Sequence, residues 1–274
     1  MRLLFAGVRG STPVSGPHIE GVGGHTSCVA VLSHDDPTPS LILDAGTGLL
    51  NLAPRFDDAP FAGTILVTHL HWDHVQGLPF FRAADRDDAR VTLGMPAQGD
   101  ARAVFERAMS PPNFPIGPDG LRGTWNFVAI EAGTHAVEGF EVTALDIPHK
   151  GGRTFGYRVS DGSRSCAYIP DHGPGGPDAK PESRERALSL ARGVDVLVHG
   201  APFTAGERAI ADLFGHATVD DAIDLARAAD VQHLVLTHHG PFRADDAVDA
   251  MGKSARAVFA HKLTIAREGR TIEV

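Results

Sequence analysis

Apolar and polar residues along this chain fall into two repeating patterns. Short runs of apolar and β-branched residues are typical of strands, whereas apolar positions at helical spacing are typical of amphipathic helices. The first pattern predicts strands at residues 2–8, 27–33, 40–43, 64–68, 90–93, 125–130, 139–146, 154–160, 164–169, 194–198, 233–237 and 262–273. The second predicts helices at about 48–56, 74–82, 98–109, 182–192, 218–229 and 244–260, with Thr218 as the N-cap of the helix at 218–229.

The order of these elements indicates the fold class. Many strands come early, and strands then alternate with helices in both halves of the chain, which predicts an α/β protein with two sheets covered by outer helices. No low-complexity linker or charged tail divides the chain, so we expect a single domain over residues 1–274.

Two segments rich in proline and glycine are predicted to be long loops. Residues 110–124 and residues 170–181 each contain four prolines and three glycines. Loops of this length in a compact domain are usually either functional or disordered. We expect the second loop to supply a metal ligand. The first is either a lid over a binding site or an excursion on the surface.

Composition limits the partners of the protein. Apolar residues make up 42% of the chain and charged residues 22%, as in ordinary globular proteins. The net charge of −9 has the wrong sign for gripping long nucleic acid through many phosphates. Residues 1–8 are apolar but too few for a signal peptide or a membrane span, so we expect a cytoplasmic protein with no membrane partner. Cys28 and Cys166 lie in strand-like runs and are expected to be buried, reduced thiols rather than a disulfide.

The richest concentration of chemistry lies at residues 68–74, which read Thr-His-Leu-His-Trp-Asp-His. They follow an apolar run that is predicted to be a buried strand, so period-two alternation places His69 and His71 on the same side of the chain. A turn into the next segment can bring Asp73 and His74 back toward the same point. Imidazole nitrogens and carboxylate oxygens are ligands of zinc, manganese and iron, so this spacing predicts one or two metal ions.

Three further polar residues follow predicted strands. His149 comes after residues 139–146, Asp171 after 164–169, and His238 after 233–237. A ligand at the end of a buried strand is held rigidly, as a metal site requires. From the residues alone, such a residue is more often an ordinary polar residue with its hydrogen bonds satisfied than a metal ligand.

The HxHxDH motif is that of the metallo-β-lactamase superfamily, and the chain resembles that family along nearly its whole length. The resemblance is closest to the phosphodiesterase branch that includes ribonuclease Z and small cyclic-phosphate phosphodiesterases. Residues 7–12, 23–28, 43–48, 148–158 and 236–239 are similar to segments of that branch. Ordinary β-lactamases lack the element Thr-Phe-Gly-Tyr-Arg at 154–158. The resemblance implies an αββα four-layer sandwich with metals at one edge, between the sheets.

The resemblance also implies a ligand set for two divalent ions, Zn²⁺ or Mn²⁺. It implies that His69, His71 and His149 hold one ion, that Asp73, His74 and His238 hold the second, and that Asp171 bridges both. Asp171 stands in the context Pro-Asp-His, where the family usually has Gly-Asp-Thr. His172 and His239 fit the family register less well than their neighbours, so we expect them to lie behind the ligands or to be exposed. Gly200 occupies a position where relatives often have an acidic residue, so a contact behind the ligands is expected to be missing.

Other residues are assigned to catalysis and substrate binding. His216 resembles the His-Ser/Thr element of the branch, whose histidine serves the leaving oxygen, and a histidine is a natural acid for that step. The alternative is a histidine at a helix start that does not touch substrate. Asp73 is counted with His216 as catalytic, and Asp44 is expected to orient a ligand by hydrogen bonds. Phe114, in the loop at 110–124, is expected to cover a base or sugar, and a homodimer would let that loop act across subunits.

These features predict a metal-dependent phosphodiesterase. Two ions would convert a bridging water to hydroxide, which attacks phosphorus while His216 protonates the departing alkoxide. The leading substrate is a small phosphodiester, a cyclic nucleotide or a ribose cyclic phosphate. One alternative is a ribonuclease Z-like nuclease acting on RNA 3′ ends, but the charge and the lack of a long basic insertion argue against it. Another is a hydrolase of lactones, thioesters or β-lactams. A metal-binding protein without activity and a diiron oxidoreductase are weaker alternatives, because the ligand positions are filled and a glutamate is missing where His71 stands.

Overall fold

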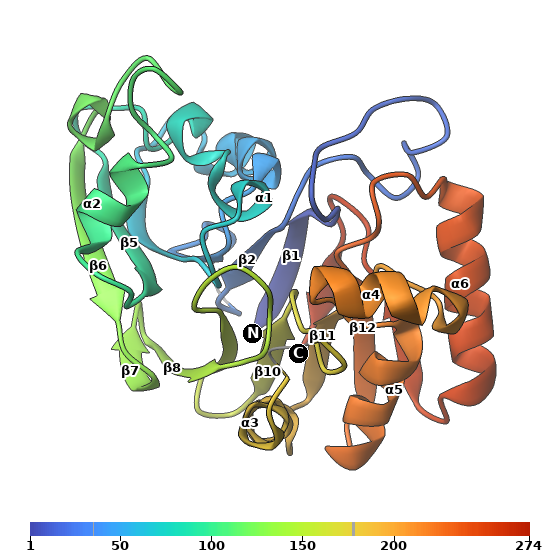
Figure 1. The fold of residues 1–274 in the computed structure, drawn as a ribbon. Coiled ribbons are helices and arrows are strands. Elements are labelled where there is room, and N and C mark those ends of the chain that lie inside the picture. The colour runs from blue at the N-terminus through green and yellow to red at the C-terminus, as the bar shows by residue number, and fades with distance from the viewer. Residues whose placement is uncertain (35, 177–178) are drawn as a thin grey trace.

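The computed structural model describes residues 1–34, 36–176 and 179–274, which form two seven-stranded mixed sheets (Figure 1). The first sheet has the strand order β14-β1-β2-β3-β4-β5-β6. Its strands are β1 (Arg2–Gly7), β2 (Cys28–Leu32), β3 (Leu41–Leu43), β4 (Ala62–Leu66), β5 (Arg90–Pro96), β6 (Thr124–Ile130) and β14 (Thr271–Glu273). The second sheet has the order β13-β12-β11-β10-β9-β8-β7. Its strands are β7 (Gly133–Val137), β8 (Phe140–Asp146), β9 (Phe155–Ser160), β10 (Ser165–Ile169), β11 (Val196–Gly200), β12 (His233–Thr237) and β13 (Lys262–Ile265).

Both sheets follow the same plan along the chain. Each begins with antiparallel pairs, β1-β2-β3 in the first sheet and β7-β8-β9-β10 in the second. Each continues with parallel pairs, from β3 to β6 and from β10 to β13. As a result β8, β10 and β12 all run in the same direction, and their carboxyl ends meet at one edge of the second sheet.

The strands β1, β2 and β3 of the first sheet are buried on both faces, which explains why they are almost continuously apolar. Leu3 and Phe5 point into the core shared with the second sheet, whereas Leu4 and Ala6 point into a second core beneath the N-terminal helices. In β2, Val29 likewise points into the shared core, whereas Cys28 and Ala30 point into the second core. Period-two geometry therefore builds two apolar layers from one run of sequence.

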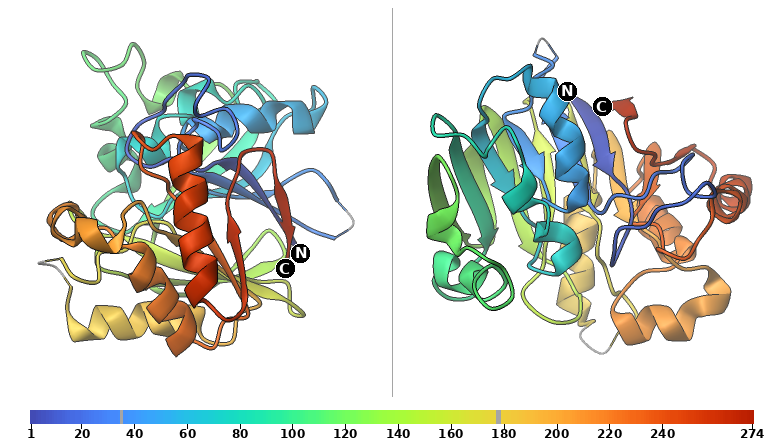
Figure 2. Two further views of the ribbon diagram at one scale, coloured as in Figure 1. Left: turned by 90° about the vertical axis from the view of Figure 1, so that its right-hand side faces the viewer. Right: turned by 90° about the horizontal axis from the view of Figure 1, so that it is seen from above.

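Helices cover the outer face of each sheet, on opposite sides of the molecule (Figures 1 and 2). The helices against the first sheet are a 3₁₀ helix at Thr47–Phe56, α1 (Trp72–Val75), a 3₁₀ turn at Leu78–Phe80, α2 (Ala101–Glu106) and a 3₁₀ turn at Pro118–Gly120. Those of the C-terminal half are α3 (Pro181–Ala191), a 3₁₀ turn at Ala205–Glu207, α4 (Arg208–Phe214), α5 (Val219–Ala228) and α6 (Asp245–Val258). This arrangement confirms the predicted α/β class with two helix-covered sheets. None of the described helices is long and apolar enough to cross a membrane.

Several element boundaries differ from the prediction. The helix expected at 74–82 is only α1 followed by a 3₁₀ turn, because Pro79 has no N–H with which to continue an α-helix. The strand expected at 262–273 is two strands in different sheets, β13 and β14, with Gly269 at a φ of 73° in the turn between them. The pattern missed β7 and α4, whose residues are largely polar or exposed. Residues 177–178 of the second predicted loop lie outside the described part of the chain.

Two local predictions are confirmed. The Thr218 side chain caps α5 by accepting a hydrogen bond from the backbone N–H of Asp221 at 3.3 Å. Cys28 and Cys166 are buried free thiols, and burial raises the pKa of Cys166 to about 12. A thiol in that state is inert packing rather than a reactive group.

Candidate metal centre

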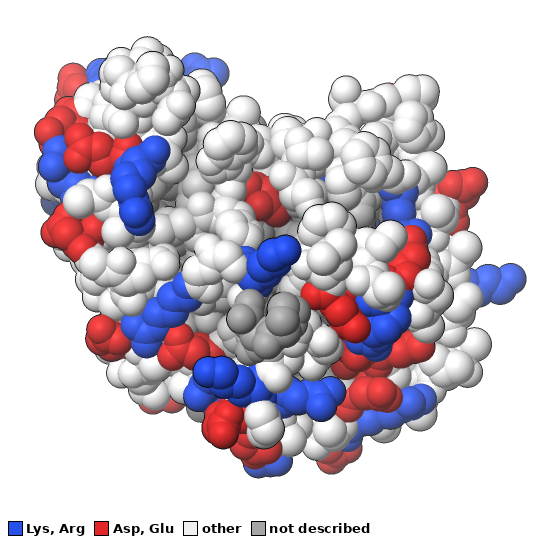
Figure 3. Space-filling view, in the orientation of Figure 1, with Lys and Arg blue, Asp and Glu red and all other residues white. Residues whose placement is uncertain are grey.

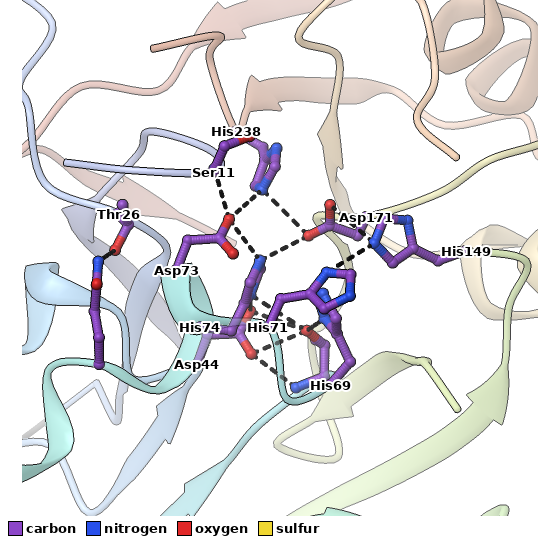
Figure 4. A network of polar contacts seen from close by, with 12 residues as sticks. Ser11, Thr26, Asp44, His69, His71, Asp73, His74, His149, Asp171 and His238 are labelled. Atoms are coloured by element: carbon purple, nitrogen blue, oxygen red, sulfur yellow. Dashed lines mark hydrogen bonds and ion pairs between the residues drawn. The ribbon is translucent and has the colours of Figure 1, made fainter. Parts of the chain in front are cut away.

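Polar side chains from four strand ends converge at one point between the two sheets (Figure 4). His69 and His71 follow β4, and Asp73 and His74 come from α1, which begins immediately after His71. The second sheet contributes one residue after each of β8, β10 and β12, namely His149, Asp171 and His238. The shared strand direction in that sheet brings these three residues to the same edge.

The converging residues form two trios with the grouping that the resemblance implied. The possible ligand atoms of His69, His71 and His149 all lie within 4.8 Å of one another. The same limit holds for the trio of Asp73, His74 and His238. Each trio supplies three nitrogen or oxygen donors, which is the number expected for an ion that keeps one position open for water or substrate.

Asp171 lies between the two trios and presents one oxygen to each (Figure 4). Its Oδ2 is 2.8 Å from Nε2 of His74 and 3.3 Å from Nε2 of His238. Its Oδ1 is 3.9 Å from Nε2 of His149, in the other trio. This placement is what a carboxylate shared by two ions requires.

Asp44 fixes the orientation of His74 from behind. Its Oδ2 accepts hydrogen bonds from Nδ1 of His74 at 2.8 Å and from the hydroxyl of Tyr168 at 2.9 Å. Its Oδ1 accepts from the backbone N–H of Thr68 at 2.7 Å. A carboxylate bonded to Nδ1 places the proton there and directs the lone pair of Nε2 toward the site. The expected orienting role of Asp44 therefore agrees with its contacts.

Burial keeps two histidines of the first trio neutral. It lowers the pKa of His69 well below its ordinary value and lowers that of His149 to about 4. Nδ1 of His149 donates to the carbonyl of Gly215 at 2.6 Å, which leaves Nε2 facing the site. Neutral imidazole is the form that binds a metal.

Charge around Asp171 and His74 is balanced within the site. Burial acts to raise the pKa of Asp171, but the surrounding histidines, His238 first among them, hold it well below its usual range. Burial acts to lower the pKa of His74, but Asp44 and the other nearby carboxylates raise it well above its usual value. The cluster therefore attracts a positive charge at Nε2 of His74, which a divalent ion can supply in place of a proton.

An unpaired buried nitrogen is further evidence that these residues can bind divalent ions. Nε2 of His69 is buried and has no hydrogen-bond partner among the residues that the structure describes. A buried nitrogen left unpaired is costly unless something binds it. The donor set of five imidazoles and two carboxylates suits zinc or manganese and does not distinguish them.

His216 reaches the site from the turn between α4 and α5. Gly215 ends α4 with a φ of 73°, a left-handed conformation that glycine adopts without strain, and the chain then turns inward. Nδ1 of His216 lies 3.1 Å from Oδ1 of Asp171. His149, Asp171 and His216 also form a trio of donors within 4.8 Å, so the geometry offers a role as a ligand beside the predicted role as a proton donor.

The structure does not bring Phe114 to this site. Its ring packs at 5.9 Å from that of Phe80, and it covers the core beneath the helices of the first sheet. Within the described residues, Phe114 lines neither of two cavities that open on His71 and His216. Within this one chain Phe114 is therefore a packing residue. A role across subunits, like the homodimer itself, stays a prediction.

The two histidines next to ligands are buried rather than exposed. Nδ1 of His172 is 3.0 Å from Nε2 of His199, and Nε2 of His239 donates to the carbonyl of Ala266 at 3.0 Å. The expectation of exposure is therefore wrong for both, and neither of these two hydrogen bonds reaches a predicted ligand. At Gly200 a Cβ atom would lie 1.7 Å from the carbonyl oxygen of Pro170, so no side chain fits there.

Sequence reasoning missed the part that residues 8–11 play. Gly10 and Val8 exchange backbone hydrogen bonds with His239, and the backbone N–H of Ser11 donates to Oδ2 of Asp73 at 2.7 Å. At Gly10, a Cβ atom would lie 2.3 Å from the ring of His238, so only glycine leaves room for that side chain. A backbone donor has no signature in the sequence. The resemblance of residues 7–12 was the only available signal.

Arg9 holds residues 8–11 in place through hydrogen bonds to two neighbouring loops. Its guanidinium is buried, with Nε donating to the carbonyl of Gly23 at 2.7 Å and Nη1 to that of Arg243 at 2.7 Å. It thereby joins the N-terminal loop to the loop that follows His238. A fully buried arginine could not be recognised from the sequence, because exposure is the usual state of that side chain.

Comparisons with known proteins agree with this geometry. Residues 40–239 match the family described as Beta-lactamase superfamily domain. The ribonuclease Z of Natronomonas pharaonis is 23% identical over 320 positions, covering 100% of this chain and 98% of that protein. The ribonuclease Z of Exiguobacterium sibiricum is 30% identical over 240 positions, covering 72% of this chain and 77% of that protein.

Solved structures share the fold at lower identity. The metallo-β-lactamase fold protein YhfI from Bacillus subtilis has a TM-score of 0.72 at 20% identity and covers 100% of this chain and 98% of its own. A diphosphatase from the PhnP family has a TM-score of 0.67 at 17% identity, covering 100% of this chain and 97% of its own. Similarity at this level supports the two-sheet fold.

Proposed function

We propose that this chain, which belongs to the metallo-β-lactamase superfamily and to its ribonuclease Z/PhnP-like branch, is a metal-dependent hydrolase whose substrates are phosphodiesters. The observation that carries the proposal is the pair of donor trios on either side of Asp171, with His216 beside them. When bound there, two divalent ions would act as Lewis acids and lower the pKa of water.

Residues of the chain would orient the ligands and donate the proton. The Ser11 N–H donates to Oδ2 of Asp73 at 2.7 Å and holds that carboxylate in place. Asp44 fixes the tautomer of His74. Nδ1 of His216 faces Asp171, so Nε2 is the ring nitrogen left to give a proton to the leaving alkoxide. Asp73 acts in this scheme as a ligand that the backbone orients.

We propose small phosphodiesters, such as cyclic nucleotides or ribose cyclic phosphates, as the leading substrates. Two facts support small size. The net charge is −9, and Figure 3 shows basic and acidic side chains interspersed on the drawn face rather than a continuous basic band. The alignment with the Natronomonas relative spans 320 positions against 274 residues here, so about 46 positions of that alignment have no residue in this chain.

The second candidate is a ribonuclease Z-like nuclease acting on RNA 3′ ends. Both curated relatives described above carry the name ribonuclease Z, and this favours the nuclease over the small-substrate proposal. The nuclease would use the same donors and the same proton donor on a longer substrate. The two candidates therefore differ in what surrounds the site rather than in its chemistry.

A competition of substrates tests both candidates. Metal-loaded protein would be assayed against 2′,3′-cyclic nucleotides, a precursor transfer RNA, bis-p-nitrophenyl phosphate, a lactone and a β-lactam, with Asp171→Ala as the control for contaminating activity. We expect kcat/KM for the cyclic phosphates to exceed that for the RNA at least tenfold, or about 1.4 kcal/mol. Equal or faster cleavage of the RNA would establish the nuclease instead. Turnover of only the lactone or the β-lactam would refute phosphodiester hydrolysis.

A further inference from the structure

A large cavity opens beside the predicted metal centre on the side of His216. Its volume is about 860 Å³, within the range of cavities that hold small-molecule ligands. The predicted ligands His71, His149 and His238 line it together with His216, so whatever occupies it lies against the reacting centre. A second cavity of about 430 Å³ shares the His71 and His216 walls. A phosphodiester at the centre thus has room on two sides for its substituents.

Three phenylalanines from separate elements line the large cavity and are called its aromatic wall below. Phe203 follows β11, Phe214 is the last residue of α4, and Phe242 follows β12. Phe242 is 95% exposed and Phe214 is 53% exposed, which is unusual for such apolar side chains. The ring of Phe203 lies 6.0 Å from that of His216, so the aromatic wall continues to the predicted proton donor. Exposed rings of this kind are available to stack on a flat ligand.

The charged residues of this wall are already engaged. Arg243 forms an ion pair with Glu207 and donates from Nε to the carbonyl of Pro202 at 2.8 Å. Nζ of Lys150 donates to the carbonyl of Leu213 at 3.1 Å. Arg243 and Glu207 offset each other's charge, so the cavity presents aromatic rings and an ion pair rather than a cluster of unpaired cations that would bind a second phosphate.

From these contacts we infer that the large cavity is a subsite for a planar aromatic substituent of the substrate, in particular a nucleobase. The inference rests on the proposed function, because it assigns the cavity to one end of a phosphodiester held at the metal centre. Stacking on an aromatic side chain is tolerant of base identity. The subsite is accordingly expected to accept purines and pyrimidines alike and to reject a substrate with no flat group.

The test compares substrates that share one reacting phosphate. Adenosine 2′,3′-cyclic phosphate, methyl riboside 2,3-cyclic phosphate and hexyl riboside 2,3-cyclic phosphate differ only in the group at the first carbon of the sugar. We expect the adenosine compound to have a KM at least about fivefold below that of the methyl compound, as loss of one stacked base would give. Phe242→Ala should abolish this difference. Phe80→Ala removes another exposed aromatic ring, one that does not line either cavity, and should preserve it.

A binding measurement separates the subsite from the proposed function. Saturation-transfer NMR would follow adenosine on metal-loaded protein and on the Phe242→Ala variant, with no hydrolysis needed. If no cyclic phosphate is cleaved but adenosine binding depends on Phe242, the proposed function fails and the subsite stands. If the methyl compound is cleaved with the same KM as the adenosine compound, or if the hexyl compound is preferred, the function stands and the aromatic subsite is refuted.

Discussion

Replacing Asp44 with asparagine should weaken both the fold and the metal site. The carboxylate is fully buried and accepts hydrogen bonds on both oxygens, from Thr68 on one side and from His74 and Tyr168 on the other. All of these partners donate. An amide has only one oxygen, so its NH₂ group must face one set of donors whichever way it turns.

The magnitude follows from those two orientations. With the NH₂ group toward Thr68, a backbone N–H at 2.7 Å loses its acceptor. A buried unsatisfied group of that kind costs about 1–3 kcal/mol, out of a typical total stability of about 5–15 kcal/mol. With the NH₂ group toward His74, Nδ1 must accept, which moves the ring proton to Nε2, the nitrogen that faces Asp171 at 2.8 Å. That is the wrong tautomer for a ligand, and losing such support costs about 10–100-fold in metal affinity.

Two measurements on the same variant test this reasoning. Urea unfolding of the metal-free protein reports the free energy of unfolding, and competition with a chelator of known affinity reports the dissociation constant for Zn²⁺. Asp88→Asn removes the same charge from an exposed residue and should change neither quantity by much. An unchanged zinc affinity in Asp44→Asn would refute the orienting role, even if the protein were less stable. No change in either measurement would refute the hydrogen-bond argument as a whole.

Three further predictions follow from the site and its surroundings. Asp171→Ala should reduce metal content from two ions per chain to one or none, and a variant with two ions and full activity would remove Asp171 from the bridge. His216→Ala should slow hydrolysis of alkyl diesters roughly 10²–10⁴-fold with metal content intact, and less for p-nitrophenyl esters, whose leaving group hardly needs a proton; loss of metal would show that His216 is a ligand instead. Burial, helped by Lys262, lowers the pKa of His233 to about 4, so its neutral form stabilises the fold above the unfolded pKa of about 6.5. That stabilisation is lost as the pH falls from about 6.5 to 4. The free energy of unfolding measured in urea should therefore fall less over this interval for His233→Asn than for the unmodified protein. The same dependence on pH in both proteins would contradict the assignment.

Strand positions were predictable because a strand that is buried on both faces appears in the sequence as a nearly continuous run of apolar residues. β1, β2 and β12 are continuous apolar runs in the sequence and fully or almost fully buried strands in the structure. The position of polar residues just beyond such runs then pointed to a site at one sheet edge. The grouping of the ligands into two trios came from the family resemblance, since the residues alone left His149, Asp171 and His238 open. In the structure the possible ligand atoms within each trio lie within 4.8 Å of one another, and so do those of His69, His74 and Asp171.

Features that depend on which segments meet in space were not predictable in the same way. The ring of Phe114 packs on that of Phe80, a contact that no local pattern encodes, so the sequence left open both a lid and a surface excursion where the structure has Phe114 packed against the core. The pairing of β14 with β1 was hidden for the same reason, because a short exposed strand can add to any open edge. The aromatic wall of the large cavity joins three elements that look unremarkable one at a time.

Contacts between the two halves of the chain also determine when the site can exist. The hydrogen bond between His238 and Asp73 joins residues 165 positions apart, and that from Arg9 to the carbonyl of Gly240 joins residues 231 apart. Contacts so distant in sequence form only when both sheets have come together, because the loop between them must first be closed. The unfolded chain therefore keeps only the local run from His69 to His74 as a metal-binding segment. Since the folded state brings both trios and Asp171 together, we expect divalent metal to bind the folded chain more tightly than the unfolded chain, and the free energy of unfolding to rise with metal concentration.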